Sequence, residues 1–160
     1  MNTMFHIIDD EVVLSALMVE LLESAGYQAV DYSDPLEYLK FVDSNHYFPP
    51  LAIITDVRMP KMGGYELIDR VRERYPQQRV IVVSGDDIGD EARNREVCHF
   101  LTKPVSPDTL FALADAITKC EGAHASDEDI KCQKLKLTFS SDAQHCAQDC
   151  FAMVNKSLKL

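Results

Sequence analysis

Four short apolar runs, each followed at once by polar residues, constrain the fold of this chain more than any other feature. They occupy residues 4–8, 51–55, 79–83 and 98–102. Continuous apolar runs of this length are typical of strands covered on both faces, as in parallel sheets. A fifth run at 27–32 alternates apolar and polar residues and is also expected to be a strand.

Segments with helical spacing are expected between these strands, at residues 12–25, 35–44 and 64–75, with a last helix that reaches about Lys119. Their boundaries carry ordinary helix signals, such as Gly26 after the first and Pro76 after the third. Strands that alternate with helices predict an α/β fold, a doubly wound five-stranded parallel sheet with helices on both faces. The stretch 86–97 is polar and weakly patterned.

Composition narrows the functional classes. The net charge of −10 argues against nonspecific nucleic-acid binding, which depends on clustered Lys and Arg. No apolar run approaches the roughly 18 residues that cross a membrane, and the N-terminus has no signal-peptide pattern. The five cysteines are an odd number without a CxxC pair, so reduced thiols are expected. A cytoplasmic protein is the resulting expectation.

Polar side chains follow the predicted strands at their carboxyl ends: Asp9, Asp10, Asp56, Ser84 and Lys103. In open parallel sheets ligands bind at this edge. Several carboxylates in one place repel each other unless one is protonated or a hard cation such as Mg²⁺ is bound. A lysine and a hydroxyl could bind phosphoryl oxygens, and an aspartate can accept a phosphoryl group as an acyl phosphate. The set therefore indicates phosphoryl transfer.

Each of these residues also has a simpler interpretation when taken alone. Asp9-Asp10 could cap a helix, Ser84 could be a turn residue, Lys103 could be a solvated charge and Asp56 could begin a loop. Capping and turn formation do not account for their joint occurrence at successive strand ends. The functional interpretation therefore depends on the ordered set.

That ordered set resembles the receiver domain of two-component response regulators. The resemblance covers about residues 3–120 and is carried by Asp9-Asp10, by DVRMPKMGGYEL from Asp56, by VVSG ending at Ser84-Gly85 and by FLTKP. It implies the strand order 2-1-3-4-5 and a receiver domain at 1–120. It also implies a module that catalyses only its own phosphorylation and dephosphorylation and is not otherwise an enzyme.

The resemblance implies a role for each acid of the set. Asp56 would be the phosphoacceptor. Asp10, Asp56 and the backbone carbonyl of Arg58 would bind Mg²⁺ directly, and Asp9 would act largely through water. The donor would be a histidine kinase or phosphotransfer protein, and the signal would pass to a downstream protein partner.

The remaining implied roles concern the switch. Lys103 would pair with the acyl phosphate, Ser84 would bond a phosphoryl oxygen and move on activation, and Phe100 would be the switch aromatic. The Lys103–Pro104 bond is usually cis in this family, and proline lowers the cost of that isomer. The interval from Ser84 to Lys103 is about one helical turn shorter than usual, which puts the family's usual output face in question.

The segment 121–160 departs from the family and is expected to be a short α+β extension. Residues 121–131 are expected to be a linker, 135–139 a possible strand, and 141 onward an amphipathic helix that opens with a capping box. So small a unit should dock on the receiver or on a second copy, which would give a homodimer. No DNA-binding pattern is present in its sequence.

Cysteine and histidine residues in this extension leave an alternative open. A zinc or redox site could be built from Cys120, His124, Cys132, Cys146 and Cys150. The spacing of these residues is irregular, and cysteine is commonly a small buried apolar residue. The alternative function is thus a dimerisation or interaction protein with a metal- or thiol-sensing tail.

Overall fold

The computed structural model describes residues 3–85 and 97–125, with side chains through Lys119. Its centre is a five-stranded parallel sheet in the order β2-β1-β3-β4-β5. The strands are β1 (Met4–Ile8), β2 (Gln28–Tyr32), β3 (Ala52–Asp56), β4 (Val80–Ser84) and β5 (His99–Thr102). The α/β class and the strand order expected from the sequence are therefore confirmed.

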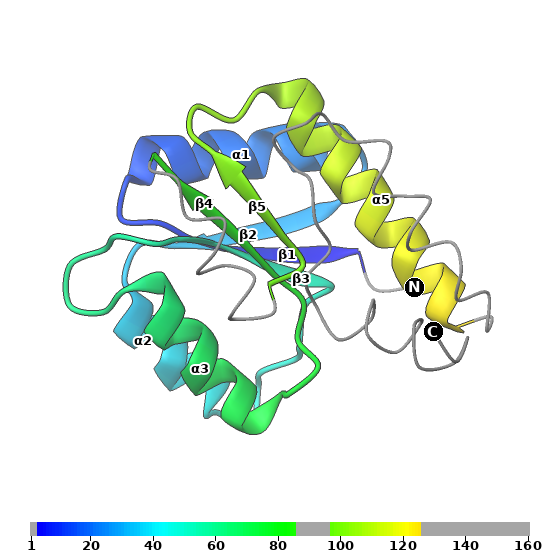
Figure 1. The fold of residues 1–160 in the computed structure, drawn as a ribbon. Coiled ribbons are helices and arrows are strands. Elements are labelled where there is room, and N and C mark those ends of the chain that lie inside the picture. Colours follow the sequence, from blue (N-terminus) through cyan, green and yellow to red (C-terminus); the bar gives the residue numbers. More distant parts are fainter. Residues whose placement is uncertain (1–2, 86–96, 126–160) are drawn as a thin grey trace, which may run out of the picture.

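Helices cover both faces of the sheet. Within the described residues they are α1 (Val12–Ser24), α2 (Pro35–Val42), α3 (Gly64–Arg74) and α5 (Pro107–Ala125). Figure 1 shows α1 and α5 on one face and α2 and α3 on the other. Such two-sided coverage explains why the strands are apolar on both faces: every residue of β3 and β4 is buried.

Each face has its own core. Beneath α1 and α5 the buried side chains include Phe5, Ile7, Leu22, Leu113 and Ile117. Beneath α2 and α3 they include Ile8, Tyr38, Ile53, Leu67 and Val82. Because neighbouring residues of a strand point to opposite faces, Ile7 and Ile8 serve different cores. Packing of both cores holds the strands in the register that brings their carboxyl ends to one edge of the sheet.

The core beneath α2 contains a buried histidine. His6 in β1 is only 5% exposed, and its Nδ1 lies 2.9 Å from the hydroxyl of Tyr38. That hydroxyl in turn lies 2.9 Å from the hydroxyl of Tyr47, and the rings of Tyr32 and Phe41 pack around the histidine. Burial lowers the pKa of His6 from 6.5 to about 4, so the ring is neutral at pH 7.

The ends of several elements differ slightly from expectation, and α5 differs most. It continues to Ala125, beyond the expected end near Lys119 and into the expected linker. Its sequence there, KCEGAHA, contains one glycine, which a helix tolerates. The boundary between a receiver at 1–120 and an extension at 121–160 stays a prediction. The segment 86–96 and the strand and helix expected after residue 130 lie outside the described residues.

No helix among the described residues is both long and apolar enough to cross a membrane.

Candidate functional site at the carboxyl edge of the sheet

The sheet brings the predicted polar residues to one edge because its strands are parallel and in register. Asp56 ends β3, and its register partner in β4 is Val83, next to Ser84. Ser84 ends β4 opposite Thr102, the last residue of β5, and Lys103 follows directly. Four strands therefore bring a polar residue to the same edge of the sheet, as predicted from the sequence positions. These residues are Asp9 after β1, Asp56 in β3, Ser84 in β4 and Lys103 after β5.

The Asp56 carboxylate is buried, and its two oxygens have different partners. Oδ1 accepts a hydrogen bond from the backbone N–H of Val57 at 2.8 Å. Oδ2 lies 3.3 Å from Nζ of Lys103. The backbone carbonyl of Asp56 accepts a hydrogen bond from the hydroxyl of Thr55 at 2.9 Å. One carboxylate oxygen is thus fixed by the loop, and the other faces the lysine.

Lys103 bridges three carboxylates. Besides Asp56, its Nζ lies 3.3 Å from Oδ2 of Asp9 and 2.9 Å from Oε1 of Glu11. Burial alone would lower the pKa of Lys103, but the hydrogen bond to Glu11 and the charges of Asp9 and Asp56 outweigh it. The pKa of Lys103 is consequently raised above its usual value, and the ammonium stays charged at neutral pH.

Asp9 is the most deeply buried acid of the group, at 3% exposed. Burial raises its pKa above the usual value, and the charge of Asp56 adds to that effect. The backbone N–H of Glu11, 2.9 Å from Oδ1, and the ammonium of Lys103 act in the opposite direction. Burial outweighs these two partners, so the net shift of the Asp9 pKa is upward.

The loop after β3 is held close by a glycine. The backbone N–H of Gly64, the first residue of α3, donates a hydrogen bond to the carbonyl of Val57 at 2.8 Å. A Cβ at this position would overlap the carbonyl oxygen of Asp56. Glycine is therefore required for α3 to begin against the backbone of the buried acid.

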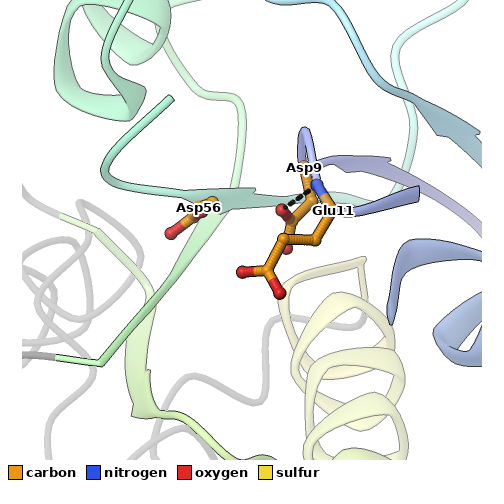
Figure 2. Close-up of side chains that lie close together, drawn as sticks. All are labelled: Asp9, Glu11 and Asp56. Carbon is orange, nitrogen blue, oxygen red and sulfur yellow. Dashed lines mark hydrogen bonds between the residues drawn. The ribbon is translucent and has the colours of Figure 1, made fainter. Parts of the chain in front are cut away.

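The acids form a group that fits a hard divalent cation. Asp9, Glu11 and Asp56 each place one carboxylate oxygen within 4.8 Å of the others, as Figure 2 illustrates. Oxygen ligands of this kind are those that Mg²⁺ prefers. Asp10, expected to be a direct ligand, is exposed and lies outside this group among the described residues. Its role as a ligand stays a prediction.

Sequence comparison agrees with this geometry. The family model described as the response regulator receiver domain matches residues 5–115. The chain belongs to this family. It is a two-component response regulator receiver, and the match does not favour the alternative of a dimerisation protein with a sensing tail.

Curated relatives and solved structures are consistent with the receiver assignment. The chain is 27% identical over 139 residues to the alkaline phosphatase synthesis transcriptional regulatory protein PhoP of Bacillus subtilis, covering 85% of this chain and 57% of PhoP. It is 29% identical over 140 residues to the transcriptional regulatory protein FixJ of Bradyrhizobium diazoefficiens, covering 83% and 67%. A receiver domain structure from Clostridium thermocellum shares the fold, with a TM-score of 0.67, 24% identity, and 75% and 97% of the two chains covered. The chain thus spans little more than half the length of PhoP.

The other predicted receiver residues lie at or near this edge. Ser84 is buried, and its backbone carbonyl accepts a hydrogen bond from the N–H of Lys103 at 2.8 Å. Phe100 is half-buried in β5 and packs against the core beneath α2 and α3. Arg58 is exposed in the loop after Asp56, as expected for a residue implicated only through its backbone. The Lys103–Pro104 peptide bond is cis, which confirms the expectation from the receiver resemblance.

Glu11 is the site residue that sequence reasoning missed. It directly precedes α1, where an acid is ordinarily explained by a favourable interaction with the helix N-terminus. Its side chain makes no capping hydrogen bond and contacts Lys103 instead. The available signal was the run of three consecutive acids, Asp9-Asp10-Glu11, after an apolar strand.

Proposed function

We propose that Asp56 accepts a phosphoryl group from a phosphohistidine of a histidine kinase or phosphotransfer protein, and that the phosphorylated receiver signals through protein–protein contact. The observation that carries this proposal is the arrangement around Asp56. A buried carboxylate with one oxygen fixed by Val57 has its other oxygen 3.3 Å from a lysine ammonium. Membership of the receiver family supports the same role.

The transfer is a displacement at phosphorus. A carboxylate oxygen of Asp56 forms the new P–O bond while the P–N bond of phosphohistidine breaks, and the electron pair of that bond returns to the imidazole. Hydrolysis reverses the modification: water attacks phosphorus, the P–O bond to Asp56 breaks, and inorganic phosphate leaves. Lys103 contributes a fixed positive charge near the oxygens on which negative charge accumulates.

Asp56, and Asp9 largely through water, would hold Mg²⁺ at this site, with Asp10 and the carbonyl of Arg58 as the further ligands that the family resemblance implies. When bound, Mg²⁺ neutralises the charge of the phosphoryl oxygens. Lys103 already contacts all three acids of the group and partly offsets their mutual repulsion. The chain therefore supplies both the oxygen ligands and a neighbouring cation.

Ser84 and Phe100 are proposed to report the modification. The hydroxyl of Ser84 would bond a phosphoryl oxygen, and movement of β4 and β5 would reposition Phe100. Because the backbone of Ser84 is bonded to that of Lys103, a shift of one is transmitted to the other. A downstream protein would recognise the altered surface. Homodimerisation through 121–160 is a further proposal about the segment outside the receiver.

The experiment is phosphorylation of the full chain by acetyl phosphate, followed by intact-mass analysis. The expected result is one added phosphoryl group in the presence of Mg²⁺, and none after the cation is removed with EDTA. Asp56→Asn should prevent the addition, whereas Asp69→Asn, at an acid on α3, should not. Equal incorporation in the wild type and Asp56→Asn would overturn the assignment.

A further inference from the structure

Lys103 makes its shortest carboxylate contact with the acid that is most exposed to solvent. Nζ is 2.9 Å from Glu11 but 3.3 Å from both Asp9 and Asp56. The Glu11 side chain is 61% exposed, whereas those of Asp9 and Asp56 are 5% and 9% exposed. Breaking the contact with Glu11 would therefore cost less free energy than breaking the contact with Asp9 or Asp56.

The backbone at Glu11 is fixed independently of its side chain. Its N–H donates a hydrogen bond to Oδ1 of Asp9 at 2.9 Å, and its carbonyl accepts the N–H of Ser15 at 3.0 Å in the first turn of α1. The side chain makes no capping bond to that turn. A carboxylate on a fixed backbone is thus directed at Lys103 from the rim of the site.

We propose that Glu11 is a positioning residue that retains Lys103 in the unmodified receiver and slows phosphorylation of Asp56 by competing for its ammonium. This inference rests on the proposed function of Asp56. It adds a residue that acts through Lys103 and restrains the reaction, in contrast to the residues that promote it.

The competition follows from the donor count of an ammonium group. Lysine has three N–H donors, and three carboxylates already surround Nζ. The donor that now faces Asp56 can pass to the phosphoryl group, but a second phosphoryl oxygen can be bonded only if the contact with Asp9 or Glu11 is given up. Glu11 is the contact that yields, because an exposed carboxylate regains water at little cost, whereas a buried one does not.

Replacing Glu11 with glutamine tests this competition with little change in shape. Glu11→Gln keeps an oxygen acceptor but removes the charge that retains Lys103. At saturating Mg²⁺ we expect acetyl phosphate to modify Asp56 about two- to fivefold faster, the range for loss of one partly exposed ion pair. Glu20→Gln makes the same charge change at an exposed position on α1 and should leave the rate unchanged.

A double-mutant cycle establishes whether the effect passes through Lys103. In a Lys103→Met background the acceleration from Glu11→Gln should disappear, because there is no ammonium to retain. An acceleration that persists there would show direct repulsion of the donor and would overturn the positioning role. The NMR signal of the Lys103 ammonium gives a second readout: it should shift in Glu11→Gln and not in Glu20→Gln.

The remaining outcomes are distinct. A rate that is unchanged or slower in Glu11→Gln at saturating Mg²⁺ would contradict the inference, and a slower rate with weaker Mg²⁺ binding would identify Glu11 as a metal ligand. A wild-type chain that takes up no phosphoryl group would instead contradict the proposed function itself. The two failures are therefore told apart by the wild-type reaction.

Discussion

Oδ2 of Asp56 and Nζ of Lys103 lie 3.3 Å apart across the end of β4, which separates the strands that carry them. The pair forms because β3, β4 and β5 are parallel and end at one edge. The same ammonium also contacts Asp9, which directly follows β1, the neighbour of β3 on its other side. A single lysine thus connects residues that follow or end three different strands.

Removing this lysine should destabilise the fold. Lys103→Met would leave the buried carboxylates of Asp9 and Asp56 without their cation, at a cost of about 1–3 kcal/mol in the free energy of unfolding at pH 7. Mg²⁺ should recover part of that loss in the variant. Urea unfolding with and without Mg²⁺ measures both effects.

A matched control is available on α5. Lys119 pairs with Asp115 at 2.8 Å, but both side chains are more than half exposed. Lys119→Met should therefore change stability little. Equal destabilisation by the two lysine variants would contradict the account of the buried group.

Gly64→Ala should destabilise the receiver by about 1–3 kcal/mol, because the added Cβ overlaps the carbonyl oxygen of Asp56 and forces α3 away from β3. The same shift should slow phosphorylation. Gly85→Ala is the comparison, since a Cβ there meets no atom within 4 Å. Thermal unfolding of both variants would measure the difference, and a tolerated Gly64→Ala would show that the contact relaxes freely.

His6 should make stability depend on pH. Its pKa is about 4 in the folded chain and 6.5 when unfolded, so below pH 6.5 the unfolded state binds the proton more readily. The free energy of unfolding therefore keeps its full value above pH 6.5, and it falls as the pH is lowered toward 4 because His6 takes up a proton only in the unfolded chain. Between pH 8 and pH 5 the loss due to His6 should be about 2 kcal/mol.

The variant His6→Phe isolates this contribution. It lacks the titrating group, so its free energy of unfolding should fall less steeply over the same pH range. Loss of the contact with Tyr38 also has a cost, but that cost does not vary with pH over this range. Parallel pH profiles for the wild type and His6→Phe would rule out the histidine as the cause.

The parallel sheet could be predicted from the sequence because most of its strands share one pattern, a short apolar run followed by a polar residue. Strands buried on both faces must be continuously apolar, so the polar residue after each run marks the edge at which ligands bind. Asp56, Ser84 and Lys103 could be assigned to that edge on these grounds alone. The strand order needed the family resemblance, since apolar runs do not specify their neighbours.

Side-chain direction could not be predicted in the same way. Asp9 and Asp10 are adjacent acids after one strand, yet Asp9 is buried beside Lys103 and Asp10 is exposed. Glu11 resembled a helix-start acid, and its contact with Lys103 depends on where β5 ends in space. The end of α5 was placed too early, because the polar residues that follow Lys119 were taken for a linker, whereas the helix continues to Ala125.

The most direct test of the central claim is to locate the phosphoryl group chemically. Full-length chain is treated with acetyl phosphate and Mg²⁺, and the acyl phosphate is reduced with borohydride, which converts a modified aspartate to homoserine. Peptide mass spectrometry should then find homoserine at position 56, in an amount that matches phosphoryl incorporation. Homoserine at Asp9 or Asp10, or incorporation with Asp56 unaltered, would contradict the account.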